Sequence, residues 1–490
     1  MNGQVNIFSK AMILLLAFGA SILGVQMPGQ SKSLVGDDSQ RPALINVGKN
    51  VLVSAVMSST PHVEPCIAVD PLDASHLVSA SIAATGSDRL FTVVTYCSFD
   101  GGETWNLGNL SALDDMRFEF AMDPWVAFGL HGPVFLSCIV SDRNGKTTAL
   151  FVFKSSDGGR TWDTPTQVPL GEGGPYDRPV LEVDRTRGSH PGNVYVAGGQ
   201  NHVDELHENL FQPSASRSTD QGKSFSNPVW IRGTNLIANV NNIAMFDDGS
   251  IILSYTDYAS SDFHRVDTPR VWTSLSTDRG LTFSPPHFVT EFHVAPPARF
   301  KYPAPLQEVA IDRSDGPFRN RVYAVWTNYE DDGTDIRVAY SNDLGLIWSK
   351  PVKINDNKNK CDEALPVIAI NASGVLGISW MDRRASPNND CYEVYFSAST
   401  DGGKSFLPNT KVSTALSCPR SVTASQSEQQ SGLTVSSRWP VGGDYAGLAA
   451  SPNGRFHLCW SDTRTGVFQL WTASAEVGSA RPAQSTRGRS

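Results

Sequence analysis

The sequence predicts an all-β fold, a single β-propeller of seven four-stranded blades, with six blades as the alternative. Two repeated patterns lead to this prediction: a short turn motif that occurs six times, and a pair of apolar strands that occurs seven times. The composition agrees, because 41 Gly, 30 Pro and only 18% charged residues among 490 suit a turn-rich β protein better than a helical or disordered one.

The N-terminal segment is predicted to be a secretory signal, residues 1–26. Its apolar run from Ala11 to Gly24 follows Lys10 and is too short to span a membrane, but it has the length of a signal core. We therefore expect a secreted or extracytoplasmic protein, periplasmic or at the cell surface, without a membrane span after export. Residues 27–44 are expected to form a linker.

The turn motif reads S-x-D-x-G-x-x-[WF], and its six copies lie 57 to 65 residues apart. An aspartate can accept backbone N–H groups of its own turn, glycine adopts positive φ, and the final aromatic residue can pack between sheets. Because the same Ser, Asp, Gly and aromatic positions recur in six copies, the motifs indicate hairpin turns rather than catalytic groups. The aspartates are Asp100, Asp157, Asp220, Asp278, Asp343 and Asp401.

Each motif joins two short strands, and a further pair of alternating apolar strands lies upstream of it. This upstream pair occurs seven times, at residues 66–83, 125–140, 180–199, 243–257, 309–328, 367–382 and 445–462. The last unit has a third strand, Val467 to Ser474, but neither a motif nor a fourth strand. A strand near Val51 to Ser54 precedes the first unit, so we expect it to complete the last one.

The predicted propeller therefore covers residues 45–475, and residues 476–490 are expected to form a disordered tail. The turn motifs in it resemble the Asp box, or BNR repeat, of sialidases and other β-propeller families.

This resemblance implies a glycan-binding and possible exo-α-sialidase-like glycoside hydrolase site with a tyrosine nucleophile, an activating glutamate, an aspartate acid and an arginine clamp. Tyr445 looks like the tyrosine that begins the innermost strand of the family's last blade. The other roles would fall to Glu308 or Glu363 as the activating carboxylate, Asp177 as the acid, and Arg178, Arg384 and Arg464 as the clamp.

Charged residues recur at the loops that enter each first strand and at those that follow each second strand. As ion pairs they would cap strand ends, and as a converging set they would bind an oxygen-rich ligand, so both interpretations stay open. The candidates for substrate binding in these loops are Arg178, Asp382, Arg383, Arg384, Asp462 and Arg464.

One position departs from the family. Glu64-Pro65-Cys66 stands where the family has Arg-Ile-Pro, and Arg178-Pro179 lies in the third unit instead. A carboxylate at that place would repel sialic acid. The alternatives are therefore a non-catalytic glycan- or protein-binding scaffold, and an endo-acting hydrolase with two carboxylates.

The remaining expectations concern partners and cofactors. A formal net charge of −9 argues against nucleic acid, so we expect a glycan or glycoconjugate as the partner, or else a protein. The ten histidines and seven cysteines show no metal-ligand spacing, and we expect no metal and no cofactor. Cys361 and Cys391 lie in neighbouring predicted loops, where a disulfide and two unrelated thiols are equally good interpretations.

Overall fold

The computed structural model describes residues 43–86, 90–116, 118–142, 148–171, 176–186, 190–203, 209–231, 237–258, 268–295, 307–331, 333–421, 435 and 441–479. The predicted signal segment, nearly all of the predicted linker and residues 480–490 lie outside these ranges. Within them, no helix is long and apolar enough to cross a membrane.

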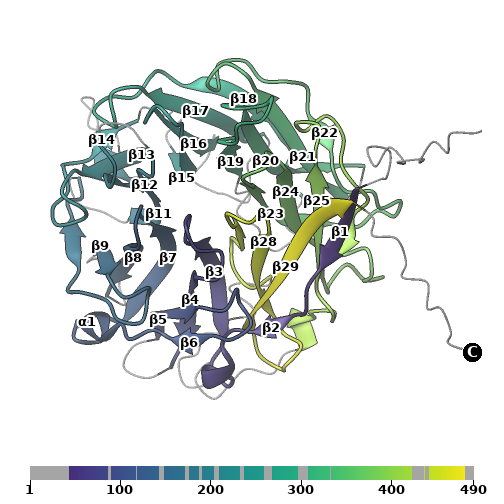
Figure 1. The fold of residues 1–490 in the computed structure, drawn as a ribbon, viewed down its shortest axis with the longest axis horizontal. Coiled ribbons are helices and arrows are strands. Elements are labelled where there is room, and N and C mark those ends of the chain that lie inside the picture. The colour runs from purple at the N-terminus through teal and green to yellow at the C-terminus, as the bar shows by residue number, and fades with distance from the viewer. Residues whose placement is uncertain are drawn as a thin grey trace, which may run out of the picture. The chain divides into compact units, whose positions relative to one another are not determined.

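The described chain is built from antiparallel groups of four strands, here called strand groups, which surround a common centre (Figure 1). Each group follows the order of the chain, and its first strand lies nearest the centre. The first three groups are β3 (His62–Val69), β4 (Leu77–Ala84), β5 (Phe91–Ser98) and β6 (Asn106–Leu107); β7 (Phe120–Phe128), β8 (Val134–Ser141), β9 (Thr148–Ser155) and β10 (Thr166–Val168); β11 (Tyr176–Val183), β12 (Val194–Val203), β13 (Asn209–Ser218) and β14 (Val229–Trp230).

Three further groups follow the same plan. They are β15 (Ile237–Met245), β16 (Ile251–Tyr258), β17 (Arg270–Ser276) and β18 (His287–Glu291); β19 (Glu308–Ile311), β20 (Val322–Glu330), β21 (Gly333–Ser341) and β22 (Val352–Lys353); β23 (Glu363–Ile370), β24 (Leu376–Asp382), β25 (Glu393–Ser399) and β26 (Thr410–Lys411). The described helices are short: α1 (Ser111–Asp114) and the 3-10 turns η2 (Ala55–Met57) and η3 (Pro419–Ser421).

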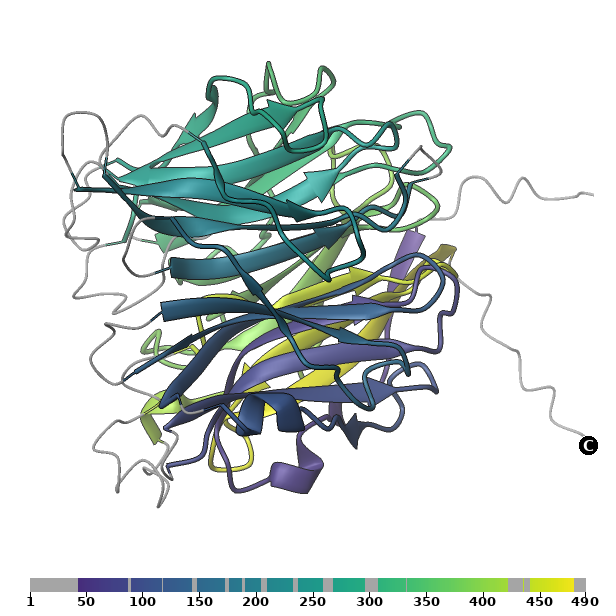
Figure 2. The same cartoon turned by 90° about the vertical axis from the view of Figure 1, so that its left-hand side faces the viewer.

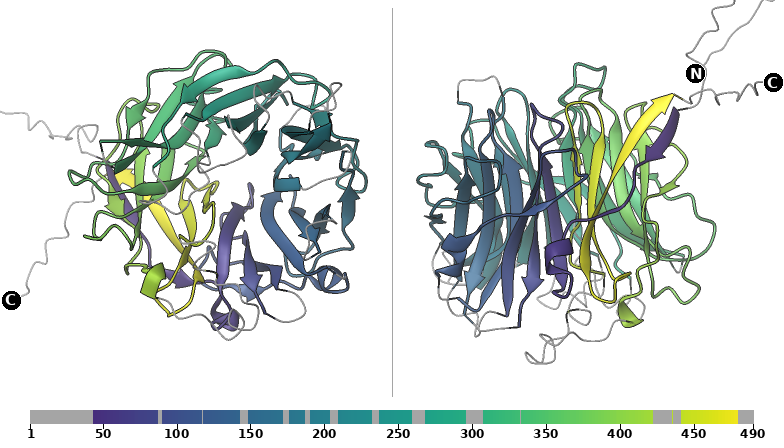
Figure 3. Two further views of the ribbon diagram at one scale, coloured as in Figure 1. Left: turned by 180° about the vertical axis from the view of Figure 1, so that it is seen from behind. Right: turned by 60° about the horizontal axis from the view of Figure 1, so that its bottom comes forward.

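The last sheet contains strands from both ends of the described chain, β27 (Gly447–Ala450), β28 (Phe456–Asp462), β29 (Gln469–Ser479), β1 (Ala43–Val47) and β2 (Val51–Leu52). β1 pairs antiparallel with the end of β29, and Val51 of β2 pairs with Thr472 (Figures 1 and 3). The predicted neighbourhood of Val51 and Leu470 is therefore present, since the Val53 amide donates to the Leu470 carbonyl at 2.9 Å. The predicted start of a disordered tail at residue 476 is too early, because β1 holds β29 in the sheet as far as Ser479.

The six turn motifs close the connection between the third and fourth strands of their groups. In each, the serine hydroxyl donates to the aspartate at 2.6–2.9 Å. The same aspartate accepts the backbone N–H four residues on, at 2.9 Å. The motif glycines have φ between 77° and 89°, which a side chain would disfavour. These contacts give the motifs a structural role.

Because the strands are antiparallel, two kinds of loop lie at opposite ends of the strands (Figure 2). The turn motifs lie at one end, together with the connections from first to second strands. The entries to the first strands lie at the other end, together with the connections from second to third strands. Side chains from different groups can therefore meet at the entry end, around the centre.

Candidate functional site

Four first strands share a bulge at their entry, and each bulge contains a residue followed by proline. The strand register shifts between Val63 and Cys66 in β3, and at the corresponding places in β7, β11 and β23. The residue before proline has positive φ of 50–54° in all four, although none is glycine: Glu64, Asp123, Arg178 and Leu365. Such strained backbone is uncommon and is often found at functional sites.

The bulges of β3 and β11 bring Glu64 and Arg178 close to Tyr445. The guanidinium carbon of Arg178 lies 5.4 Å from the centre of the Tyr445 ring. The ring of Trp125 lies 5.9 Å away from the same tyrosine ring. Glu64, Arg178 and Tyr445 are 3%, 6% and 5% exposed, so they form a buried polar cluster near the centre of the entry end. We call Glu64, Asp123, Asp177, Arg178 and Tyr445 the central cluster.

Three carboxyl groups of the central cluster influence one another. Burial, together with Asp123, Asp444 and Asp177, raises the pKa of Glu64 well above its usual range. Burial and the neighbouring Asp177 raise the pKa of Asp123 to about 7. Asn239 donates to Asp177 at 2.6 Å, and the Arg178 amide donates to Asp123 at 3.3 Å. Near neutral pH Glu64 therefore keeps its proton, and Asp123 is partly protonated.

Several buried polar atoms of the central cluster have no hydrogen-bond partner within the described part of the chain. They are the three guanidinium nitrogens of Arg178, Oε2 of Glu64 and the Tyr445 hydroxyl. Leaving such atoms unpaired costs free energy, so each one needs an explanation. A bound ligand with several hydroxyl groups, or several water molecules, would supply hydrogen-bond partners for these atoms.

The Tyr445 hydroxyl is held neutral. Burial, and then the charges of Glu64 and Asp123, raise its pKa well above the usual value, while Arg178 opposes them. Glu64, at the start of β3, is therefore the carboxyl group that raises the pKa of Tyr445 most. This differs from the expectation that Glu308 or Glu363 would be its activating carboxylate.

Glu308 and Glu363 have other contacts. Oε2 of Glu308 accepts the Ile368 amide of the next strand group at 3.1 Å, and burial raises its pKa to about 7 against the opposing effect of Arg178. Glu363 is buried and accepts the Cys361 thiol at 3.0 Å. Glu308 thus borders the central cluster, whereas Glu363 belongs to a separate set of side chains.

The other predicted arginines do not join Arg178. Arg384 forms an ion pair with Asp382 at 2.8 Å and lies over the Tyr395 ring. Arg464 does the same with Asp462 at 2.6 Å, over Trp471. Arg383 donates to the Asn389 carbonyl at 2.6 Å. The ion-pair interpretation therefore describes these rim residues, and the expected clamp of Arg178, Arg384 and Arg464 is not assembled.

A cavity of about 450 Å³ runs along the first strands around the centre. Its lining is largely apolar, with polar side chains from several strand groups, among them Glu182, Arg185, Asn242, Glu308 and Arg313. Trp125 lines the cavity and also contacts Tyr445, whereas none of the five residues of the central cluster lines it. The central cluster is therefore connected to the cavity through Trp125.

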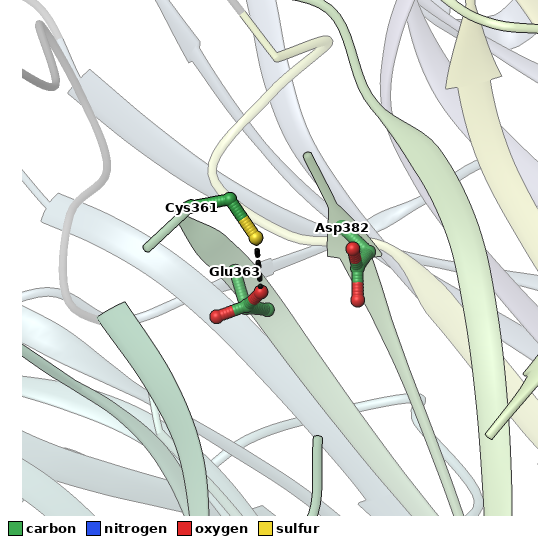
Figure 4. A group of neighbouring side chains, drawn as sticks. All are labelled: Cys361, Glu363 and Asp382. Atoms are coloured by element: carbon green, nitrogen blue, oxygen red, sulfur yellow. Dashed lines mark hydrogen bonds between the residues drawn. The ribbon is translucent and has the colours of Figure 1, made fainter. Parts of the chain in front are cut away.

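The structure contains a disulfide, but it does not join Cys361 to Cys391. Cys391 forms a disulfide with Cys418, which lies on the connection between β26 and β27. Cys361 is a free, buried thiol beside Glu363 and Asp382 (Figure 4). A Cys361–Cys391 disulfide is therefore wrong, and the thiol of Cys361 remains available for other chemistry.

Comparison with known proteins begins with the repeats. Residues 96–107, which contain the first turn motif, match the family model described as BNR/Asp-box repeat. The chain therefore contains a BNR/Asp-box repeat at these residues. No curated protein matches its sequence.

Solved structures resemble this chain over most of its length. A protein of unknown function from Dyadobacter fermentans is 13% identical with a TM-score of 0.50, and the match covers 89% of this chain and 99% of that one. A Hadza microbial sialidase is 13% identical with a TM-score of 0.47, covering 81% and 73%. An α-L-arabinofuranosidase from Fusarium graminearum is 16% identical with a TM-score of 0.45, covering 73% and 98%. At these identities the likeness concerns the fold.

Sequence reasoning placed Tyr445, Asp177 and Arg178 among the candidates but gave Glu64 and Asp123 no chemical role. A signal for both exists in the printed sequence. Glu64-Pro65 and Asp123-Pro124 stand at the same position of their first strands as Arg178-Pro179. A repeated residue-proline pair at a strand entry indicates a bulge, because proline cannot donate to the strand ladder.

Proposed function

We propose that this Asp-box propeller binds the end of a glycan at the central cluster and hydrolyses it as an exo-acting glycosidase. The observation that carries the proposal is the set of unpaired buried polar atoms on Glu64, Arg178 and Tyr445. These atoms come from three strand groups and face the same region, as expected for a site that surrounds a ligand rich in oxygen.

In the proposed reaction Tyr445 is the nucleophile. Its hydroxyl oxygen bonds to the anomeric carbon, and its proton passes to Glu64 in the minority of molecules in which that carboxyl group is ionised. The bond from the anomeric carbon to the glycosidic oxygen breaks, and that oxygen takes the proton of Asp123, whose pKa is raised to about 7. Water then releases the sugar and returns a proton to Asp123, while Glu64 returns the phenolic proton to Tyr445.

Arg178 would orient the substrate by donating to its oxygen atoms. A guanidinium group binds two oxygens of a carboxylate or of neighbouring hydroxyls well, and the guanidinium nitrogens of Arg178 have no hydrogen-bond partner among the described residues. One arginine beside several acids favours a neutral sugar over a sialic acid, whose carboxylate the resembling family holds with three arginines. The low exposure of Tyr445, 5%, suits a terminal sugar better than the middle of a polymer.

The architecture and location of the protein form part of the proposal. We infer seven blades, the last completed by the N-terminal strands, and the pairing of β1 and β2 with β29 supports this. Export is supported by the apolar run at residues 11–24 and by the disulfide between Cys391 and Cys418.

The test is hydrolysis of a panel of chromogenic glycosides, covering sialosides, uronides, arabinosides and neutral hexosides. Tyr445→Phe should reduce kcat on the accepted substrate by at least about a hundredfold, the scale of losing one essential group. Tyr323→Phe is the matched control, because Tyr323 is also buried with an unpaired hydroxyl but lies outside the central cluster. Turnover that Tyr445→Phe leaves unchanged would refute the role of Tyr445.

The second candidate function is glycan binding without cleavage. Glu64, at the place where the resembling family has an arginine, favours it, because it removes one anion-binding group from the site. In that case glycan arrays would show binding by the natural protein that Arg178→Gln abolishes, while no substrate in the panel releases sugar.

A further inference from the structure

A second buried cluster lies at the entry end of the sixth strand group and plays no part in the proposed hydrolysis. Cys361 precedes β23, Glu363 begins that strand, and Asp382 ends the neighbouring β24, where it pairs with Glu363. The Cys361 sulfur lies 3.0 Å from Oε1 of Glu363. One donor atom from each of the three residues lies within 4.8 Å of the others, and Figure 4 shows the three side chains reaching toward one another from two strands.

This cluster is closed to solvent and has an unpaired acceptor. Cys361 is 4% exposed, and Glu363 and Asp382 are fully buried. Oε2 of Glu363 has no hydrogen-bond partner within the described ranges. Arg384 offsets the charge of Asp382 at 2.8 Å, so Glu363 and Cys361 are the buried groups whose charge a cation would offset.

We propose that Cys361, Glu363 and Asp382 bind a divalent transition-metal ion of the zinc class. One thiolate and two carboxylates are ligands that Zn²⁺ accepts, usually in four-coordinate geometry. A thiolate disfavours Ca²⁺ and Mg²⁺, which take oxygen ligands. The donor set therefore selects the kind of metal.

The surroundings fit a metal ligand set. Asp382 accepts Nε1 of Trp380 at 2.9 Å and Nε of Arg384 at 2.9 Å, which hold the orientation of its carboxylate. The hydroxyl of Thr334 donates to the Glu363 carbonyl at 2.6 Å and fixes the start of β23. Hydrogen bonds of this kind to metal ligands orient them and are characteristic of metal sites.

The proposed ion would have a structural role. It would link the segment that enters β23 to the end of β24. The Asp362 amide donates to the Asn389 side chain at 3.0 Å, so the loop between β24 and β25 packs against the segment that carries Cys361. That loop is anchored in turn by the disulfide of Cys391 with Cys418. Metal and disulfide would together fix the rim of this strand group.

The experiment measures bound metal in the purified full chain after exposure to zinc chloride and extensive dialysis. The natural protein should hold about one zinc ion per chain, as expected for one site. Cys361→Ser and Glu363→Gln should each hold at least about tenfold less. Cys459→Ser is the matched control, since Cys459 is also a buried free thiol but lies beside Ser79 rather than carboxylates, and it should retain the metal.

Cobalt substitution gives an independent readout. Co²⁺ bound to the natural protein should show thiolate-to-metal charge-transfer absorption that Cys361→Ser lacks, and excess Ca²⁺ should not displace the ion. The proposal fails if the natural protein binds no more zinc than Cys361→Ser, or if the cobalt spectrum lacks the thiolate band. Should Cys361→Ser not fold, the near-isosteric Glu363→Gln and the cobalt spectrum of the natural protein decide the matter.

Discussion

Glu308 shows how one buried carboxyl group can link two strand groups and still retain a proton. It begins β19, and its Oε2 accepts the Ile368 amide of β23 at 3.1 Å. Burial raises its pKa from 4.5 to about 7. The protonated form is therefore the one that folding favours, and raising the pH works against it.

Glu308→Gln should make folding stability less sensitive to pH. Because the folded pKa is raised, the contribution of Glu308 is complete below about 4.5 and is lost as the pH rises to about 7. Glutamine keeps an acceptor for the Ile368 amide and cannot ionise. Denaturant unfolding at pH 5 and pH 8 should show the variant gaining about 3 kcal/mol relative to the natural protein across this interval.

The exposed Glu103→Gln serves as the control and should keep the natural pH dependence; Glu103 forms only a surface ion pair with Lys49. An identical pH slope for Glu308→Gln and the natural protein would show that Glu308 ionises as readily in the folded state as in the unfolded one.

At the scale of the element, the turn motif could be predicted from the sequence because its hydrogen bonds are local. In the third motif they all lie within the seven residues from Ser218 to Ser224, which are the same residues that the sequence pattern specifies. In the third motif Asp220 accepts the Ser224 amide at 2.9 Å and the Ser218 hydroxyl at 2.7 Å. Partial desolvation raises the pKa of Asp220, but the bonds from Ser224 and Ser218 outweigh it and lower the pKa to about 2.

Asp220→Ala should destabilise the fold without changing activity. It removes an acceptor for backbone and hydroxyl donors in an exposed turn, which costs about 1–2 kcal/mol. Thermal unfolding at pH 7 checks the loss, and glycoside hydrolysis or glycan binding checks the central cluster. Lys223→Ala is the control in the same turn, because Lys223 contributes only its backbone amide to Asp220. Equal melting temperatures for the two variants would contradict the structural role of the aspartate.

The strand bulges and the disulfide could not be predicted as well as the turns. Positive φ at Glu64 or Arg178 depends on the register with the neighbouring strand, which is set by pairing over the whole strand. The pairing of Cys391 with Cys418 depends on the path of the segment after β26, which brings Ser417 opposite Tyr392. The residue-proline pairs indicate where the bulges lie but not the strand register, and no local pattern encodes the disulfide pairing.

At the scale of the whole molecule, the central cluster depends on the meeting of the first and last strand groups. The Glu64 amide donates to the Gly442 carbonyl at 2.8 Å, although hundreds of residues separate the two. A side chain at Gly443, with φ of 130°, would come within 2.5 Å of Glu64. The resemblance predicts a role for Tyr445, but its acidic neighbour Glu64 follows from this meeting of distant groups, which the order of residues along the chain does not indicate.

The N-terminal strands should therefore govern the stability of the whole fold. β1 and β2 pair with β29, and Asn50 between them connects two strand groups. Its side chain donates to the Val412 carbonyl at 2.9 Å and accepts the Thr414 amide at 2.8 Å and Nη1 of Arg464 at 3.0 Å. Losing these three bonds in Asn50→Ala should cost about 1–3 kcal/mol.

A chain that begins at Val53 should lose far more than one that begins at Ala43, because it also exposes the edge of β29. We expect its melting temperature to fall by about 10 °C or more, with concentration-dependent association through the open edge. Lys49→Ala, which removes only a surface ion pair with Glu103, should melt like the natural protein. If the chain beginning at Val53 melted with the one beginning at Ala43, the pairing of β1 and β2 with β29 would contribute nothing to the stability of the fold. The direct contacts between the first and last strand groups, such as those of Glu64 with Gly442 and of His62 with Phe468, would then hold them together.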